Sequence, residues 1–349
     1  MSIVIVTGST GLVGSESVNF FCEKGFDVVG IDNNLRKYFF GKDGSTAWIK
    51  KKLLQKNKKY KHYNIDIRNF DELKKIFKKI GKSTSLVIHC AAQPSHDYGK
   101  KFPILDFNVN AAGTLNLLEL TKIYCPNSPF IFMSTNKVYG DNPNNLKITE
   151  KKDRWELDKK DKLFNGIDEN FSIDHCTHSF FGVSKTYADL IVQEYGKNIG
   201  LKTACFRAGC ITGPNHSGAK LHGFLSYLVK ISLTKKKYSL IGYKGKQVRD
   251  NLHSHDLINC FWEFFKQPKR GEVYNIGGGR FSNCSILEAL QFMERKLKIS
   301  IKTTMVSTPR VGDHIWYISN LNKFKKHFPN WKQKYDTEKI LSEMIESYK

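Results

Sequence analysis

The start of the chain, a strand followed by a glycine-rich loop and a helix, is the feature that most constrains its fold. Residues 2–7 form a short apolar run of the kind found in buried parallel strands, and Gly8-x-x-Gly11-x-x-Gly14 follows at once. Gly8 allows a tight turn, Gly11 lets the backbone approach a pyrophosphate, and Gly14 permits close packing of a helix on the strand. The pattern predicts a dinucleotide-binding site.

A second strand ends in an acidic residue at the distance that such a site requires. Residues 26–31 are mostly apolar, and Asp32 follows them, 18 residues beyond Gly14. A carboxylate there accepts hydrogen bonds from both ribose hydroxyls and repels a 2′-phosphate, which favours NAD over NADP. We therefore expect NAD to place its phosphates at the helix start, over Leu12 and Val13, and its ribose beside Asp32 and Asn33.

Strands and helices go on alternating along the chain. We predict strands at 63–67, 85–89, 129–133 and 202–207, and helices at 70–80, 104–123 and 180–196. This order predicts an α/β fold of the Rossmann type, with a doubly wound parallel sheet. Asp66 and Ile67 end one strand where adenine is expected, and Ala91 and Ala92 are small enough for a loop that crosses close over a cofactor.

Shorter elements begin at Thr212, among them a helix at 224–233, a strand at 238–243 and a surface helix at 335–348. We expect residues 1–211 to form the NAD-binding domain, with the polar segment 141–174 passing over the mouth of the active site. Residues 212–349 would form a smaller α/β substrate lobe. Because no clean linker separates the two parts, the lobe is expected to be interleaved with the first domain.

Polar residues that follow the predicted strands are candidates for substrate contacts, because ligands of open parallel sheets bind beyond the carboxyl ends of the strands. Thr135 follows the strand at 129–133 and is placed to touch a substrate hydroxyl. For His96, in the loop 94–98, substrate contact and a plain loop role are both open. The other residues assigned to this substrate site are Gln93, Ser95 and Asn136.

The net charge of +23 does not, in our interpretation, indicate a protein that binds nucleic acid or a membrane surface. Only nine of the 56 basic residues are arginine, and the lysines fall in runs typical of a solvated surface. The scarcity of arginine makes individual arginines informative. Arg207, Arg249 and Arg310 are candidates for planar, bidentate donors.

Cysteine spacing and the apolar runs indicate the compartment. No apolar stretch is long enough to span a membrane, and the first residues enter a strand without the features of a signal peptide, so we expect a cytoplasmic protein. The eight cysteines are dispersed, with neither a CxxC pair nor a cysteine–histidine spacing typical of metal ligands. We therefore predict reduced structural thiols and no metal site.

Motifs spread over nearly the whole chain resemble those of the extended short-chain dehydrogenase/reductase superfamily, in its nucleotide-sugar epimerase branch. The residues that carry the resemblance are Gly8, Gly11, Gly14, Asp32, Asp66-Ile67, Ala91-Ala92, Asn110, Ser134-Thr135, Val138-Tyr139-Gly140 and Lys185. Within this branch the longer strings look most like those of the CDP-paratose 2-epimerases, also called CDP-tyvelose epimerases. These strings are Ser134 to Asp141, His178-Ser179, and Gly245 to Asp250 followed by His253.

The resemblance implies an enzyme that holds NAD and uses it as a catalytic oxidant of a nucleotide-diphosphate sugar, with a CDP-sugar favoured. Hydride leaves a sugar carbon, C2 in the 2-epimerases, and returns to the opposite face. In the family a Tyr–Lys pair handles the proton; Lys185 matches the lysine, and Thr135 matches the residue that binds the reacting hydroxyl. Arg249 and Arg310 match arginines that clamp the diphosphate, and Asn110 matches a cofactor residue. A homodimer or higher homo-oligomer is the implied assembly.

Phe181 occupies the position of the family's tyrosine and cannot carry a proton. A missing general base costs roughly 10²–10⁴-fold in rate. Three explanations are open: an engineered Tyr-to-Phe change, loss of catalysis with retained binding of a sugar nucleotide, or a natural substitution in which another group takes over. We favour the last, and the candidates for the replacement are Cys176, His178, Tyr98 and Lys185.

Asn136 and Lys137 follow Thr135, where relatives that eliminate water from a hexose carry Asp and Glu. The sequence therefore argues against a 4,6-dehydratase. A 4-epimerase, a decarboxylase, a reductase and a catalytically silent sugar-nucleotide binding protein are the alternatives to a 2-epimerase.

Overall fold

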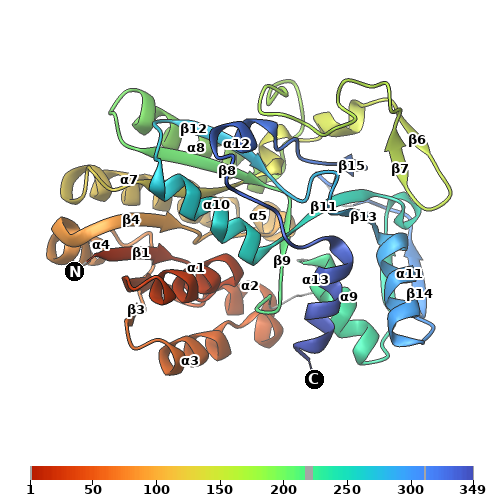
Figure 1. Cartoon of the computed structure of the whole chain (residues 1–349), viewed down its shortest axis with the longest axis horizontal. Coiled ribbons are helices and arrows are strands. Elements are labelled where there is room, and N and C mark those ends of the chain that lie inside the picture. Colours follow the sequence, from red (N-terminus) through yellow and green to blue (C-terminus); the bar gives the residue numbers. More distant parts are fainter. Residues whose placement is uncertain (1, 217–222, 310–311, 349) are drawn as a thin grey trace.

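A seven-stranded parallel sheet forms the centre of the molecule (Figure 1). The computed structural model describes residues 2–216, 223–309 and 312–348. The strands follow the order β12-β8-β5-β4-β1-β2-β3, and each neighbouring pair runs parallel. Their bounds are β1 (Ile3–Thr7), β2 (Asp27–Ile31), β3 (Tyr60–Tyr63), β4 (Thr84–His89), β5 (Phe130–Thr135), β8 (Thr203–Ala208) and β12 (Glu272–Ile276). This arrangement confirms the predicted doubly wound α/β fold.

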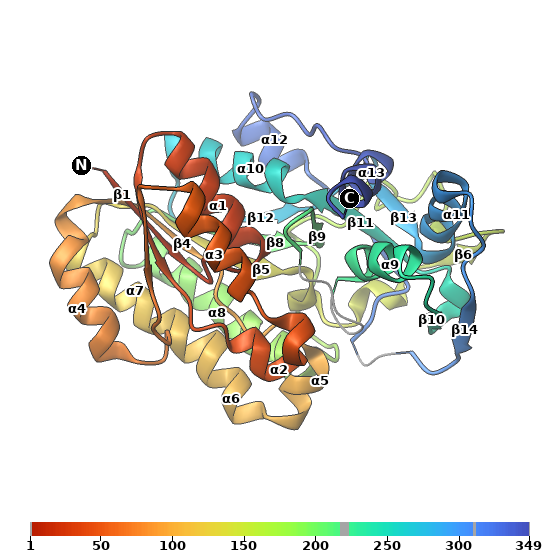
Figure 2. The ribbon, with the colours of Figure 1, turned by 90° about the horizontal axis from the view of Figure 1, so that it is seen from below.

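Helices cover both faces of the sheet because its strands carry apolar side chains on both sides. In β1, Val4 and Val6 pack toward one face and Ile5 packs toward the other. The first face is covered by α1 (Leu12–Glu23), α3 (Ala47–Lys56), α10 (Ser254–Lys266) and α12 (Asn322–His327). The second face is covered by α4 (Phe70–Ile80), α7 (Gly113–Tyr124) and α8 (Ser179–Lys197). Figure 2 shows α1 and α10 on one side of the sheet and α4 and α7 on the other.

The strand predicted at 63–67 is wrong, because β3 ends at Tyr63. β3 pairs with β2, and Ile31 is the last residue of β2 in this pairing, so the backbone beyond Tyr63 has no strand beside it. Asp66 instead accepts hydrogen bonds from the backbone N–H and the Nε of Arg68, which turns the chain toward α4.

The long helix predicted at 104–123 is present, but a wide turn interrupts it. It consists of α6 (Pro103–Phe107), a π turn at Asn108–Ala112, and α7. The π turn holds Asn110, whose buried side chain bonds the loop that follows β4. The wide turn is therefore placed where the helix meets the candidate site.

A smaller lobe, on the right in Figure 1, is built from the C-terminal part of the chain. β11 (Val248–His253) pairs with β9 (Cys210–Thr212), β13 (Asn283–Ser285) and β15 (Trp316–Tyr317), and β10 (Tyr238–Ile241) pairs with β14 (Thr303–Val306). The helices of the lobe are α9 (Phe224–Leu233), α11 (Ile286–Leu297) and α13 (Thr337–Glu346). Within the predicted tail helix, α13 is not merely a surface helix, since Ile340 and Leu341 are fully buried in the core of the lobe.

The two parts of the molecule are interleaved. β12 and α10 follow residue 211 in the sequence but complete the sheet and its covering layer. The segment 141–174 leaves the first part, and its hairpin of β6 (Ile148–Glu150) and β7 (Trp155–Leu157) packs on the lobe. There Arg154 pairs with Glu288, and the indole N–H of Trp316 donates to Glu156 at 2.9 Å.

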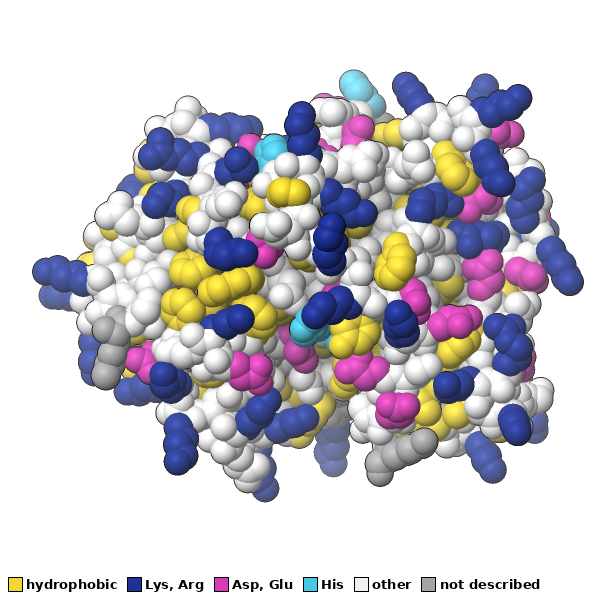
Figure 3. Space-filling view, viewed as in Figure 1, with side chains coloured by type: hydrophobic (Ala, Val, Ile, Leu, Met, Phe, Trp, Pro, Cys, Tyr) yellow, Lys and Arg dark blue, Asp and Glu magenta, His cyan; other side chains and the backbone are white. Residues whose placement is uncertain are grey.

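The surface mixes charges of both signs on the face that Figure 3 shows, where lysine and arginine side chains are spread over both parts with acidic side chains among them. Within the described ranges, no helix combines the length and the apolar character needed to cross a membrane. All eight cysteines have free thiols. Among the residues that the structure describes, no cluster of three His, Cys, Asp or Glu side chains is able to hold a metal ion.

Candidate active site

The glycine-rich loop turns from β1 into α1 in the way that a dinucleotide requires. Gly8 has φ +65°, a left-handed conformation that favours glycine. A Cβ on Gly14 would lie 2.1 Å from the carbonyl oxygen of Gly8, so α1 reaches the loop this closely only with glycine at that position. A Cβ on Gly11 would lie 3.3 Å from the same oxygen. The loop is therefore tight, and its glycines leave the backbone without side chains where a dinucleotide would approach.

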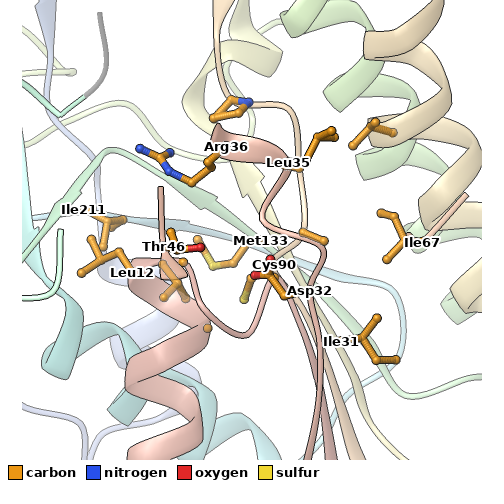
Figure 4. A pocket seen from close by; sticks show the side chains of 18 of the residues that line it. Leu12, Ile31, Asp32, Leu35, Arg36, Thr46, Ile67, Cys90, Met133 and Ile211 are labelled. Atoms are coloured by element: carbon orange, nitrogen blue, oxygen red, sulfur yellow. The ribbon is translucent and has the colours of Figure 1, made fainter. Parts of the chain in front are cut away.

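A pocket lies at the carboxyl ends of β1, β2, β4 and β5, beside this loop (Figure 4), and we call it the cofactor pocket. Nearly all of the residues predicted to bind a cofactor line it. They are Gly8, Gly11, Leu12, Val13, Gly14, Asp32, Asn33, Asp66, Ile67, Ala91, Ala92 and Lys185.

Asp32 is fixed at the end of β2 by two backbone N–H groups. Its Oδ2 accepts from Thr10 at 3.0 Å and its Oδ1 accepts from Asn34 at 2.7 Å. Asn34 has φ +55°, and its side-chain oxygen accepts from the N–H of Thr46 at 3.0 Å. The hydroxyls of Thr46 and Thr10 lie 2.7 Å apart. The Asp32 carboxylate thus belongs to a network that joins the glycine loop to the loop after β2.

Asp66 anchors the neighbouring loop. It accepts a hydrogen bond from Asn33 at 2.8 Å and another from Nη2 of Arg68 at 2.7 Å. Burial raises the pKa of Asp66, but the hydrogen bonds from Arg68 outweigh burial and hold this pKa below its usual value. Asp66 is therefore an anion at neutral pH, and it holds Asn33 at the edge of the cofactor pocket.

Lys185 reaches the cofactor pocket from α8, one helical turn after Phe181. Its Nζ donates to the carbonyl of Met133 at 2.7 Å and lies 4.0 Å from the centre of the Phe132 ring. Burial lowers the pKa of Lys185 to about 8, against the attraction of Asp189. An ammonium with this pKa loses its proton close to the physiological range.

Asn110, Gln93 and Ser95 were predicted to touch cofactor or substrate, but they line neither pocket described here. The side-chain oxygen of Asn110 accepts from the N–H of Gln93 at 2.9 Å, and its amide donates to Ser184 at 3.0 Å. Gln93 donates to the carbonyl of Ser95 at 2.8 Å and to Asp106. These buried side chains hold the loop after β4 against α8 from behind, because a buried polar group must find such partners.

A second pocket adjoins the first on the side of the smaller lobe, and we call it the lobe pocket. Four residues predicted to bind substrate line it: His96, Thr135, Asn136 and Arg249. The residues that line both pockets are Pro94, Thr135, Phe181, Gly209, Ile211 and His216. No residue of the segment 141–174, which we expected over the mouth of the active site, lines either pocket.

Two cations and a carboxylate lie together in the lobe pocket. Arg249 on β11 forms an ion pair with Asp313. Lys137 donates from Nζ to the carbonyl of Gly312 at 2.8 Å, and burial lowers its pKa to about 8 although Asp313 attracts the ammonium. Two cations and one carboxylate leave a net positive charge here, which suits an anionic group of a ligand. Arg310, the second predicted clamp, lies outside the described residues.

Phe181 and Thr135 stand where the two pockets meet. The side chain of Phe181 is 8% exposed, and the ring of His96 packs against it edge to face, with centroids 5.0 Å apart and planes at 67°. The hydroxyl of Thr135 accepts from the N–H of Lys137 at 3.2 Å. Phe181 gives this junction an apolar surface but no proton.

Cys176 and His178, predicted as replacements for the missing tyrosine, line neither pocket. The Sγ of Cys176 lies 3.6 Å from Nε2 of His178, and this nitrogen is also 2.9 Å from the carbonyl oxygen of Val138. Burial raises the pKa of the Cys176 thiol, which is the wrong direction for a base. Both side chains therefore lie away from the junction.

Arg207, one of the three arginines that the sequence singled out, has a structural role. It is buried on β8 and donates to both oxygens of Asp189 on α8, from Nε at 3.1 Å and from Nη2 at 2.8 Å. Its Nη1 donates to the hydroxyl of Tyr139 at 3.1 Å. The expected bidentate contact is present, but its acceptor is a carboxylate of this chain.

Several residues of the pockets were not predicted from the sequence. They are Arg36, Thr46, Lys137, Asn215 and His216. Arg36 carried a usable signal, since arginine is scarce in this chain and this one stands four residues after Asp32. Lys137 belonged to a string on which the resemblance rested, but no role was assigned to it. The other three come from loops whose approach to the site has no local pattern.

Residues 4–277 match the family described as "NAD dependent epimerase/dehydratase family". The chain belongs to this family. Its cofactor is NAD, and the family resemblance stated from the sequence is confirmed. The cofactor pocket fits this group: Gly8, Gly11 and Gly14 line it without side chains, so the backbone is open to a pyrophosphate, and Asp32 offers a carboxylate of the kind that binds ribose hydroxyls.

Relatives with two epimerase specificities are similar to the chain. A CDP-paratose 2-epimerase of Salmonella typhi is 30% identical over 326 residues, which cover 92% of this chain and 91% of that protein. A UDP-glucuronate 4-epimerase of Thermodesulfobacterium geofontis is 26% identical over 347 residues, covering 99% and 95%. The solved structure of UDP-glucuronic acid 4-epimerase from Bacillus cereus, in complex with UDP-glucuronic acid and NAD, has a TM-score of 0.79 at 21% identity, covering 99% and 98%. This last likeness shows the common fold.

Proposed function

We propose that the enzyme inverts C2 of a nucleotide-diphosphate sugar, with a CDP-sugar as the favoured substrate. The observation that carries the proposal is the meeting of the cofactor pocket and the lobe pocket at Thr135 and Phe181. A cofactor in one pocket and a sugar in the other would face each other at this junction, as hydride transfer requires. The choice of C2 and of CDP is supported by the 30% identity with a CDP-paratose 2-epimerase over 92% of the chain.

Three side chains receive roles in this proposal. Bound NAD supplies a reversible hydride acceptor. Lys185 holds the nicotinamide ribose through its ammonium, and Thr135 binds the reacting hydroxyl of the sugar. Arg249 holds the diphosphate, with the charge of Lys137 beside it.

The residues after Thr135 favour epimerisation over the elimination of water. Asn136 and Lys137 line the lobe pocket next to the junction. Elimination needs both an acid and a base at the sugar. The amide of Asn136 is neither at neutral pH, which leaves Lys137 as the one proton-transferring side chain of the two. A 4-epimerase needs the same kinds of side chain as a 2-epimerase, so the site alone does not decide between them. The experiment below determines whether C2 or C4 is inverted.

We also propose that the enzyme is a homodimer that pairs through α6 and α8. Apolar side chains gather on the exposed sides of these two helices, where Ile104 is 77% and Val183 57% exposed. The rings of Phe107 on α6 and Tyr187 on α8 lie 5.9 Å apart, so the two helices present one continuous apolar surface. An exposed surface of this kind is typical of a protein–protein interface.

The test is to incubate the purified enzyme, without added cofactor, with CDP-, UDP-, GDP- and dTDP-sugars in deuterated water. NMR follows the sugar and absorbance follows NADH. We expect a C2 epimer of a CDP-sugar without deuterium at the inverted carbon, because hydride returns from the cofactor and not from water. Inversion at C4 would refute the assignment of the carbon. Binding with no product and no transient NADH would refute the proposal in favour of a silent binding protein.

A further inference from the structure

We propose that His96 exchanges the proton with the reacting sugar hydroxyl, in place of the tyrosine that Phe181 replaces. The inference deepens the proposed epimerisation and rests on it. It assigns the missing general base to a residue on a different element, the loop after β4, where α5 (His96–Lys101) begins.

The position of His96 is the first ground. It lines the lobe pocket together with Thr135, the residue proposed to bind the reacting hydroxyl. Its ring is in edge-to-face contact with the ring of Phe181, with centroids 5.0 Å apart. A hydroxyl held between Thr135 and Phe181 therefore lies in the neighbourhood of this imidazole.

The support of the His96 ring is the second ground. Its Nδ1 lies 2.8 Å from Oγ of Ser179, and the same Oγ accepts from the N–H of Gly182 at 3.3 Å. Ser179 has φ +63°, an unfavourable backbone conformation for a serine. When Ser179 accepts the Nδ1 proton, Nε2 carries the lone pair with which an imidazole takes up a proton.

The room around the His96 ring is the third ground. Gly312 packs against it, and a Cβ on this glycine would lie 3.3 Å from both Cε1 and Nδ1 of the imidazole. Gly312 also has φ +73°, a conformation that favours glycine. The same glycine accepts from Lys137 through its carbonyl, so it links His96 to the charged part of the lobe pocket.

The other candidates for the base are placed less well. Lys185 donates to the carbonyl of Met133 and lines the cofactor pocket but not the lobe pocket. Tyr98 lines neither pocket and stacks on Phe102, with ring centroids 6.2 Å apart. Cys176 and His178 lie together beside the carbonyl of Val138, as described above.

The proton and the electrons balance with the cofactor of the family. As the hydroxyl O–H bond breaks, an N–H bond forms on Nε2 of His96, and the C–H electron pair leaves the sugar carbon as hydride to NAD. The hydroxyl becomes a carbonyl, and His96 becomes an imidazolium. When hydride returns to the opposite face, the imidazolium gives the proton back to the carbonyl oxygen, and both groups regain their starting state.

The experiment compares the wild-type enzyme with His96→Ala on the sugar nucleotide that the wild type epimerises. We expect the steady-state rate and the single-turnover formation of NADH to fall by about 10²–10⁴-fold, with the NAD content and the melting temperature retained. Imidazole added to His96→Ala should restore part of the rate, because a free base can enter the space of the lost ring. A rate of His96→Ala within about threefold of the wild type would overturn the proposal.

Three further variants sharpen the test. His178→Ala is the matched control, the same substitution at a histidine outside both pockets, and it should keep the wild-type rate. Phe181→Tyr in the His96→Ala background should regain at least about tenfold, because a phenol beside Lys185 rebuilds the usual pair. If the melting temperature of His96→Ala is below that of the wild type, His96→Gln replaces it in the test. The glutamine amide keeps polar contacts but does not take up a proton. Loss of activity in His96→Gln that Phe181→Tyr, added to the same variant, does not rescue would overturn the role.

Comparing the wild type with His96→Ala distinguishes a failure of the proposed role of His96 from a failure of the proposed epimerase function. A wild type that epimerises and a His96→Ala variant that does so equally well refute His96 alone. A wild type that binds sugar nucleotides but converts none of them refutes the proposed function, and the role of His96 falls with it.

Discussion

At the scale of single residues, Lys185 combines a buried ammonium with a low pKa, and this links stability to pH. Burial lowers its pKa from 10.5 to about 8, so the folded enzyme loses this proton at a lower pH than the unfolded chain. Between pH 8 and 10.5 the unfolded state therefore binds the extra proton, and the free energy of unfolding rises with pH. Below pH 8 both states are protonated, and the cost of burying the charge is fully present.

We expect Lys185→Met to remove this dependence. As the pH rises from 8 to 10.5, the wild type should gain up to about 3 kcal/mol of stability relative to the variant, because only the wild type sheds the proton on folding. Urea unfolding of both proteins across this range measures the difference. Lys137 titrates in both proteins and cancels. A difference that stays constant with pH would contradict the prediction.

The glycines of the loop should separate the fold from cofactor binding. Gly14→Ala places a methyl 2.1 Å from the carbonyl oxygen of Gly8 and 2.8 Å from Cα of Ser9. Since both contacts are backbone, we expect a loss of about 1–3 kcal/mol of stability, measured by thermal melting. Gly11→Ala is the matched control, because its closest contact is 3.3 Å. With NAD removed from both proteins it should melt as the wild type does, and it should lose bound NAD, measured by absorbance after denaturation. Equal melting temperatures of Gly14→Ala and Gly11→Ala would contradict the prediction, because they would show that the backbone moves enough to relieve the collision at Gly14.

The same residues show what a sequence reveals at this scale. Gly8, Gly14 and Asp32 were predictable because their geometry is set by neighbours in a strand, a turn and a helix start. His96 and Phe181 are distant in the sequence, and only the packing of α5 on α8 brings their rings together. The sequence therefore indicated that the tyrosine is missing, but it did not indicate that His96 lies beside Phe181.

At the scale of elements, the exposed apolar faces of α6 and α8 predict an assembly. We expect Val183→Asp combined with Leu190→Asp to convert a dimer into a folded monomer, because both side chains are exposed and a buried charge would oppose pairing. Light scattering measures the mass, and thermal melting checks the fold. Leu54→Asp, at an exposed residue of α3 on the other face of the sheet, is the control and should leave the dimer intact. A wild type that is already a monomer would refute the assembly.

Element ends were predicted well where local signals decide them. α4 spans Phe70–Ile80 as predicted, and the Asn69 side chain caps it by accepting from the N–H of Glu72 at 3.2 Å. β3 was misplaced because the length of β2 decides where pairing stops. The π turn at Asn108–Ala112 was not predicted, since buried contacts of Asn110 and not a sequence period favour it.

At the scale of the whole molecule, the sheet depends on strands from both ends of the chain. β12 completes it beside β8, and α10 covers the face that α1 also covers. We expect a fragment of residues 1–211 to lack a cooperative unfolding transition, whereas the full chain has one, because the fragment would expose an apolar edge and half of a shared core. Circular dichroism during heating measures this. A fragment that melts cooperatively would show that the first part folds by itself.

The fold class was predictable at this scale because strand and helix periods alternate along the chain. The course of the segment 141–174 was not, since its hairpin is held by side chains of the lobe such as Glu288 and Trp316, and these partners have no mark in the sequence. The division near residue 211 likewise describes the order of the chain better than its packing.

The two backbone hydrogen bonds to Asp32 carry a consequence for how cofactor preference could evolve. The carboxylate that we assign to the ribose also ties Thr10 in the glycine loop to Asn34 in the next loop. Replacing Asp32 to admit a 2′-phosphate would remove a repulsive charge. Arg36 also lines the pocket, where its guanidinium would attract the added phosphate. The same replacement would also remove the hydrogen bonds that join the glycine loop to the loop after β2. A lineage moving toward NADP would therefore have to acquire a new tether before, or together with, its new specificity.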